Sequence, residues 1–316
     1  MPPIFAIVGP TATGKSDLAM RLARELDGEI INADALQVYR GFDLGTAKPS
    51  PEEQAEIPHH LIDILDPRER YSAGEFARRA RLALEQIEAR GRAALVVGGS
   101  GLYIRALFEG ISPIPPGDPK IRRRLRQRLD EEGLEVLQGE LSEVDPVTAG
   151  KINDGDAQRV LRGLEVALAT GRPLSSWVAS RPFGSEPLPA VKVGLTLPRE
   201  VLYDQIERRA RKMVAEGWLD EIQRILAAGV PVDAPAFQAI GYRQLLRHVG
   251  GEWSLEQALS ATIQATRRFA KRQMTWFRKE PGIRWLPAQD LTFSCSQLLS
   301  VHLVRDLGGS NGEAQH

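Results

Sequence analysis

Eight residues near the start of the chain have the composition of a phosphate-binding loop. Residues 9–16 fit the pattern G-x-x-x-x-G-K-[ST] and lie between an apolar run and a helical pattern. Such a loop points backbone amides at a diphosphate, and the helix N-terminus and the lysine add positive charge. We predict a diphosphate site in which the Ser16 hydroxyl holds Mg²⁺. Its residues are Gly9, Pro10, Thr11, Ala12, Thr13, Gly14, Lys15 and Ser16.

The loop does not by itself define which diphosphate is bound. It is most common in nucleoside triphosphate hydrolases, which normally carry a second strand that ends in a metal-holding carboxylate. Here residues 94–97 run into the glycine-rich turn 98–101 instead. Asp34 or Asp63 remains as an alternative source of that acid. The hydrolase interpretation is therefore weakened but still open.

Asp34 is the second residue whose position favours chemistry. It follows a short apolar run, residues 29–33, and so emerges at the carboxyl edge of a parallel sheet, the same edge as the phosphate loop. A carboxylate beside a diphosphate can take the proton from a nucleophile, which is general-base catalysis. The alternative is an aspartate that only caps a helix or fixes a loop.

The elements that must position these residues alternate between strands and helices. Apolar runs at 4–8, 29–33, 93–97 and 191–197 predict strands, and helical patterns include 72–90, 198–228 and 254–277. This alternation predicts an α/β fold: a P-loop NTPase-like, mostly parallel sheet flanked by helices. His59 and His60 follow Pro58 in what we interpret as a loop, with a structural role rather than a metal-binding one.

A turn-rich segment, residues 112–119, marks a domain boundary because four of its residues are proline. The following pattern is helical throughout, which predicts a small all-helical insertion domain at 118–187. The catalytic core then comprises 1–117 and 188–307. Residues 308–316 have nothing apolar to bury, so we predict a disordered tail.

Composition narrows the class of protein. The 316 residues include 41 basic and 41 acidic side chains, which argues against a protein that coats nucleic acid through its overall charge. Local basic clusters at 120–128 and 267–279 suit a protein that grips one defined polyanion. The single cysteine, Cys295, excludes an internal disulfide. No apolar run is long enough for a membrane span, and we expect a cytoplasmic protein, as a monomer.

An ordered set of motifs across nearly the whole chain resembles the tRNA dimethylallyltransferases. The motifs that carry the resemblance are residues 9–16, 34–41, 45–49, 58–61, 71–73, 98–103, 158–159, 239–244 and 270–273. The resemblance implies transfer of a dimethylallyl group from dimethylallyl pyrophosphate to the exocyclic amino group of an adenosine. That adenosine lies 3′-adjacent to the anticodon of tRNAs that read codons beginning with U.

The resemblance also implies roles for individual residues. Asp34 is the base, Thr11, Lys15 and Ser16 hold pyrophosphate and magnesium, and Arg209 stabilises the departing pyrophosphate. The residues expected to contact the tRNA anticodon stem-loop are Asp34, Ala35, Leu36, Gln37, Ser100, Arg122, Gln158, Arg159, Val160, Leu161 and Arg162. Ala35 stands where the family usually has serine, which puts one hydroxyl contact in doubt.

Three rival functions remain. An adenylate isopentenyltransferase that acts on free nucleotide is a near relative, but the helical insertion and the second basic cluster favour tRNA over it. A small-molecule kinase would use the same loop for ATP, with residues 122–128 in a lid. A non-catalytic RNA-binding module would use the loop to anchor a backbone phosphate, which leaves Asp34 and Lys15 without a purpose.

Overall fold

The structure is a computed structural model, and it describes residues 3–112, 114–179, 187–292 and 295–299. The chain divides into two compact units: Met1–Phe108 with Pro189–His316, and Glu109–Leu188. The sequence analysis placed the insertion at 118–187. The predicted tail at 308–316 lies outside the described residues.

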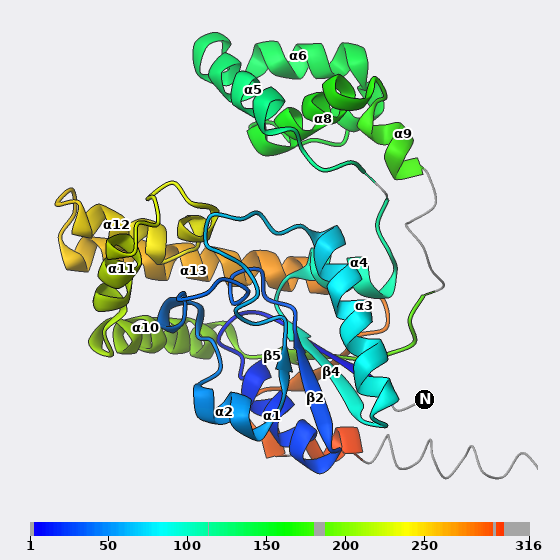
Figure 1. Cartoon of the computed structure of the whole chain (residues 1–316), viewed down its shortest axis with the longest axis vertical. Coiled ribbons are helices and arrows are strands. Elements are labelled where there is room, and N and C mark those ends of the chain that lie inside the picture. The colour runs from blue at the N-terminus through cyan, green and yellow to red at the C-terminus, as the bar shows by residue number, and fades with distance from the viewer. Residues whose placement is uncertain (1–2, 113, 180–186, 293–294, 300–316) are drawn as a thin grey trace, which may run out of the picture. The chain divides into compact units, whose positions relative to one another are not determined.

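The first unit is built on a six-stranded sheet in the order β3-β2-β4-β1-β5-β6, and every pair of neighbours is parallel (Figure 1). Strands β1, β2 and β4 are buried along nearly their whole length, as expected of a parallel sheet covered on both faces. The predicted α/β class with a parallel sheet is confirmed. The strands are β1 Ile4–Val8, β2 Gly28–Asn32, β3 His59–His60, β4 Ala93–Gly98, β5 Val191–Thr196 and β6 Arg284–Pro287.

Helices surround this sheet, and the apolar face of α1 shows how one of them packs against it. Leu18 and Leu22 of α1 are fully buried in a cluster with Phe5, Ile7 and Leu95 of the sheet. The helices of this unit include α1 Lys15–Glu25, α2 Pro51–Glu56, α3 Ala73–Ala89, α4 Gly101–Phe108, α10 Arg199–Ala215, α11 Trp218–Ala227, α12 Tyr242–Val249 and α13 Leu255–Phe277. Two short 3₁₀ helices, η1 Leu44–Thr46 and η2 Pro235–Gln238, also belong to it.

Two sequence predictions about these elements were wrong. His59 and His60 form the edge strand β3, which pairs with Ile30 and Ile31 of β2. The predicted helix 198–228 is two helices, because Gly217 adopts a φ of +102°, a left-handed conformation that ends α10 and begins α11. Strand β6 was not predicted, since its four residues are too few to show a period.

The second unit contains helices joined by turns, and its described residues include no strand. It contains α5 Pro119–Glu132, α6 Leu134–Val144, α7 Pro146–Ala149, α8 Ala157–Thr170 and α9 Leu174–Ala179. Its core is a small cluster of aliphatic side chains contributed by α5, α6 and α8: Leu125, Leu137, Leu141, Val160 and Leu164.

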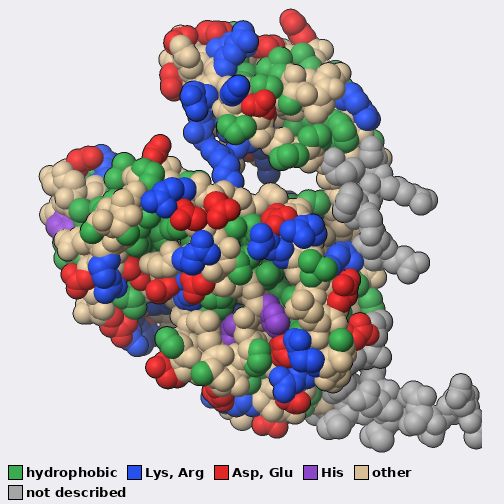
Figure 2. Space-filling view, viewed as in Figure 1, with side chains coloured by type: hydrophobic (Ala, Val, Ile, Leu, Met, Phe, Trp, Pro, Cys, Tyr) green, Lys and Arg blue, Asp and Glu red, His purple; other side chains and the backbone are tan. Residues whose placement is uncertain are grey.

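Basic and acidic side chains are intermixed on the surface of the first unit, in keeping with the balanced net charge (Figure 2). No helix of the described residues is long and apolar enough to cross a membrane.

A buried carboxylate fixes the segment that comes after β2. Glu221 of α11 is 2% exposed, and its side chain accepts the backbone N–H of Asp43 at 3.1 Å and of Leu44 at 2.7 Å. The Tyr242 hydroxyl donates a third hydrogen bond at 2.5 Å. One ionised side chain therefore anchors η1 to two helices that are distant in the sequence.

We predict that Glu221→Gln lowers the free energy of unfolding by about 1.5–3 kcal/mol, because a neutral amide replaces a charged acceptor and leaves buried donors unpaired. Chemical denaturation monitored by circular dichroism measures this loss. The control is Glu216→Gln, which removes only a long, exposed ion pair to Lys212 at 3.6 Å and should change stability by less than about 0.5 kcal/mol. Equal losses in the two variants would contradict the anchoring role.

Candidate active site

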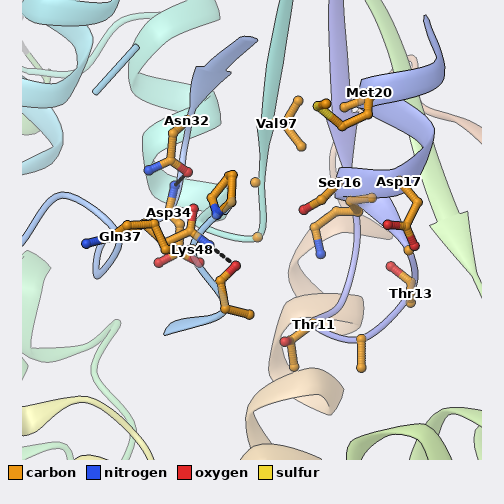
Figure 3. A pocket seen from close by; sticks show the side chains of 18 of the residues that line it. Thr11, Thr13, Ser16, Asp17, Met20, Asn32, Asp34, Gln37, Lys48 and Val97 are labelled. Carbon is orange, nitrogen blue, oxygen red and sulfur yellow. Dashed lines mark hydrogen bonds between the residues drawn. The ribbon is translucent and has the colours of Figure 1, made fainter. Parts of the chain in front are cut away.

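A cavity of about 590 Å³ lies at the carboxyl edge of the sheet in the first unit. The phosphate loop forms one wall, and the ends of β2 and β4 form another. The segment 46–49 and the helix α10 also line it. In Figure 3, Thr11, Thr13 and Ser16 line one side of this cavity, and Asp34, Gln37 and Lys48 line the opposite side. The phosphate loop and Asp34, both predicted from the sequence to be functional, thus line the same cavity.

The phosphate loop has the conformation that its residues predict. Gly9 has a φ of +138°, and a Cβ there would lie 2.7 Å from the Leu195 carbonyl oxygen, so only glycine fits between β1 and β5. The Thr13 hydroxyl donates to the Pro10 carbonyl at 2.8 Å and closes the loop. The helix α1 begins at Lys15, so its amides and its dipole face the cavity.

Two cations from different elements face this loop. Lys15 donates from Nζ to the Pro10 carbonyl at 2.6 Å. Burial and, to a lesser extent, the Arg209 charge lower the pKa of Lys15 to about 8, and Asp34 partly opposes this shift. Burial also lowers the pKa of Arg209, on α10, while Asp34 and Asp17 raise it. Both side chains line the cavity. These two cations therefore line the cavity together with the carboxylates of Asp17, Asp34 and Glu53.

Asp34 lies across the cavity, two residues after the end of β2. Its backbone N–H donates to Asn32 Oδ1 at 3.1 Å, and its own Oδ1 accepts the Leu36 N–H at 2.8 Å. Burial raises the pKa of Asp34, while the Leu36 amide and the Lys15 charge oppose the rise. The loop-fixing role that the sequence left open is thus present. A raised pKa also makes the carboxylate a stronger base.

The carboxylate that a hydrolase would need is not offered by Asp63. Lys48 Nζ lies 2.5 Å from Asp63 Oδ1 and 2.5 Å from Asp43 Oδ1, and it also donates to the Tyr39 carbonyl at 2.9 Å. The Lys48 side chain is only 3% exposed. Lys48 received no role from the sequence, and the structure gives it a local one: it ties together the segments that border Asp34.

Gln37, which lines the cavity, and Ser100, which follows β4, are two further residues predicted to contact RNA. Gln37 donates from Nε2 to the carbonyls of Thr46 and Ala47, both at 3.0 Å, so its side chain is held against the cavity wall. Ser100 follows β4 and is partly buried, and its carbonyl accepts the Tyr103 N–H at 2.9 Å at the start of α4. Ala35 and Leu36 are partly buried beside Asp34.

The remaining predicted RNA contacts belong to the second unit. Arg122 and Arg162 both form ion pairs with the buried Glu165, at 2.6 and 3.0 Å. Gln158 and Arg159 are exposed, and Leu161 is partly buried. Val160 is fully buried in the core of this unit, so its side chain has no surface with which to contact a ligand.

Sequence reasoning missed the role of Gln273. This side chain of α13 is 6% exposed and reaches the phosphate loop, where it accepts the Thr11 N–H at 2.9 Å. A glutamine on the buried face of a helix was the available signal, because buried polar side chains need specific partners.

One metal ligand was predicted, Ser16. Its side chain is exposed in the first turn of α1, lines the cavity and lies next to Asp17. Magnesium commonly takes only one or two protein ligands and completes its shell with phosphate oxygens and water, so this donor fits it. In the described residues, no group of three or more His, Cys, Asp or Glu side chains could hold a metal ion.

The fold and the cavity define a class: an α/β protein with a phosphate-loop motif that faces a carboxylate across a cavity. Comparison with known proteins narrows it. The IPP transferase family model matches residues 37–280, so the chain belongs to the IPP transferase family. It is 48% identical over 283 residues to the tRNA dimethylallyltransferase of Geobacter metallireducens, a match that covers 90% of this chain and 92% of that protein.

Solved structures agree with this assignment. The full-length tRNA isopentenylpyrophosphate transferase from Bacillus halodurans superposes with a TM-score of 0.70 at 36% identity, and the match covers 98% of this chain and 99% of that one. A eukaryotic dimethylallyltransferase acting on tRNA has a TM-score of 0.78 at 28% identity, with 98% and 80% covered.

The pKa of Lys15 generates a prediction for ligand binding. Protonated Lys15 attracts a phosphate anion, and this form predominates below a pH of about 8. The affinity for inorganic pyrophosphate should therefore fall above that pH, approaching about tenfold per pH unit. Calorimetry across pH 6.5–9.5 measures it.

Lys15→Arg is the matched control, because arginine stays charged over this whole range. Its affinity should lack the step seen in the unmodified protein. The same pH dependence in both proteins would show that Lys15 does not set the affinity.

Proposed function

We propose that this protein transfers the dimethylallyl group of dimethylallyl pyrophosphate to the exocyclic amino nitrogen of the adenosine 3′-adjacent to the anticodon. Its substrates would be tRNAs that read codons beginning with U, and the products N6-isopentenyladenosine and pyrophosphate. The observation that carries the proposal is the cavity in which Asp34 faces the phosphate loop, Lys15 and Arg209. The similarity to tRNA dimethylallyltransferases supports it.

The donor half of the site follows from the charge of the leaving group. When the allylic carbon–oxygen bond breaks, its electron pair leaves with pyrophosphate. Backbone N–H groups of residues 12–16, together with Lys15 and Arg209, would stabilise that charge. Thr11 adds a hydroxyl on the same wall, as Figure 3 shows. Magnesium, held by Ser16 and pyrophosphate oxygens, would supply further charge neutralisation when bound.

The acceptor half needs positioning and a base. An adenine amino group is a weak nucleophile, so holding it beside the allylic carbon supplies much of the rate. As the nitrogen–carbon bond forms, the amino proton passes to the Asp34 carboxylate. The raised pKa of Asp34 suits that transfer, because the carboxylate holds the proton more strongly than an exposed aspartate would.

Contacts to the tRNA come, in this proposal, from both units. The target base has to leave the stack of the anticodon loop to enter the cavity. In the first unit, the contacts would come from Asp34 and Gln37, which line the cavity, and from Ala35, Leu36 and Ser100. The helical unit would contribute Arg122, Gln158, Arg159, Leu161 and Arg162 to the stem-loop. A cytoplasmic location and a monomeric state stay predictions.

Asp34→Asn tests the base directly. The asparagine still accepts the Leu36 N–H and preserves the loop but cannot take a proton. Transfer at saturating substrates should fall by about 10²- to 10⁴-fold, while tRNA affinity stays within about threefold. Rates come from nucleoside mass spectrometry and affinities from filter binding.

Asp233→Asn is the control, because it neutralises an exposed carboxylate that does not line the cavity. Its transfer rate should change by less than about fivefold, since substitutions of exposed side chains away from the reacting atoms have small effects. Unchanged turnover in Asp34→Asn would remove Asp34 as the base.

A further inference from the structure

The side-chain amide of Gln273 joins two segments that are far apart in the sequence. Its Oε1 accepts the Thr11 N–H at 2.9 Å, and its Nε2 donates to the Gly99 carbonyl at 2.9 Å. Thr11 belongs to the phosphate loop, and Gly99 belongs to the turn between β4 and α4. Gln273 itself comes from α13, near the other end of the chain.

We infer that Gln273 is a positioning residue that locks the donor loop to the turn carrying Ser100, and so sets the spacing between the two substrates. The inference rests on the proposed function, in which the loop holds pyrophosphate and Ser100 contacts tRNA. It also removes the Thr11 N–H from the set of amides free to bind phosphate, because that donor is already paired.

Close packing shows that α13 and the turn are fitted to each other. A Cβ at Gly99 would lie 2.1 Å from Gln273 Nε2, and one at Gly101 would lie 2.2 Å from Trp276 Cδ1. Gln273 and Trp276 are three residues apart and therefore share one face of the helix. Both glycines leave room for that face. A displacement of α13 would therefore disturb both the Gly99 turn and the phosphate loop.

The chemistry of the contact requires an amide. One end of the side chain must accept from an N–H and the other must donate to a carbonyl, which a carboxamide does and a carboxylate does not. The side chain is 6% exposed, so water does not readily replace either partner. Leucine would keep the approximate size and lose both hydrogen bonds. Glutamate would keep the bond from Thr11 and lose the one to Gly99.

The test compares Gln273→Leu and Gln273→Glu with Thr262→Val. Thr262 is 3% exposed on the same helix, and its hydroxyl donates to the Ala258 carbonyl of its own helix, at 2.8 Å. Single-turnover transfer at saturating substrates should fall by about 10- to 100-fold in both Gln273 variants. Thr262→Val should transfer at the rate of the unmodified protein, even with a comparable fall in melting temperature.

Amide hydrogen exchange at Thr11, measured without substrates, separates the clamp from the reaction. Exchange should be slow in the unmodified protein and in Gln273→Glu, and fast in Gln273→Leu. Unchanged exchange in Gln273→Leu, or transfer close to the unmodified rate in both Gln273 variants, would overturn the inference. If the unmodified protein transferred no prenyl group, the proposed function would fail, while the exchange data would still decide whether Gln273 holds the loop.

Discussion

Parallel strand pairing brings the carboxyl ends of neighbouring strands to one edge of a sheet, and the candidate site depends on that edge. Strand β4 lies between β2 and β1, so the segments after these three strands converge there. The phosphate loop comes after β1, Asp34 after β2 and the Gly99 turn after β4. The pairing of the strands thus determines which residues lie close enough to contact the same substrate.

Electrostatics then gives the edge its chemistry. Lys15 and Arg209 face Asp34 across the cavity, and burial disfavours the charged form of all three: it lowers the pKa of the two cations and raises that of the carboxylate. Bound pyrophosphate would favour the protonated, charged forms of Lys15 and Arg209. The Asp34 carboxylate, with its raised pKa, would be a stronger base than an exposed aspartate. The same low-dielectric cavity therefore suits both halves of an allylic transfer.

The parts of this arrangement with a local signal could be predicted from the sequence. The loop has its own motif, and the apolar runs before Gly9 and Asp34 are long enough to identify strands. The two-residue strand β3 and the break at Gly217 have no such signal, because pairing partners and backbone conformation decide them. The contacts of Gln273 span 262 and 174 residues, which no local pattern encodes. Val160 is the opposite case. A local motif predicted that it contacts tRNA, but its side chain is buried in the core of the second unit.

The most direct test of the central claim is to incubate the purified protein with Mg²⁺, unmodified tRNA and either dimethylallyl pyrophosphate or ATP, followed by nucleoside mass spectrometry. The account predicts an isopentenyl mass gain on one adenosine with the allylic donor and none with ATP. No gain on any tRNA, with ATP consumed instead, would contradict it and favour a P-loop kinase.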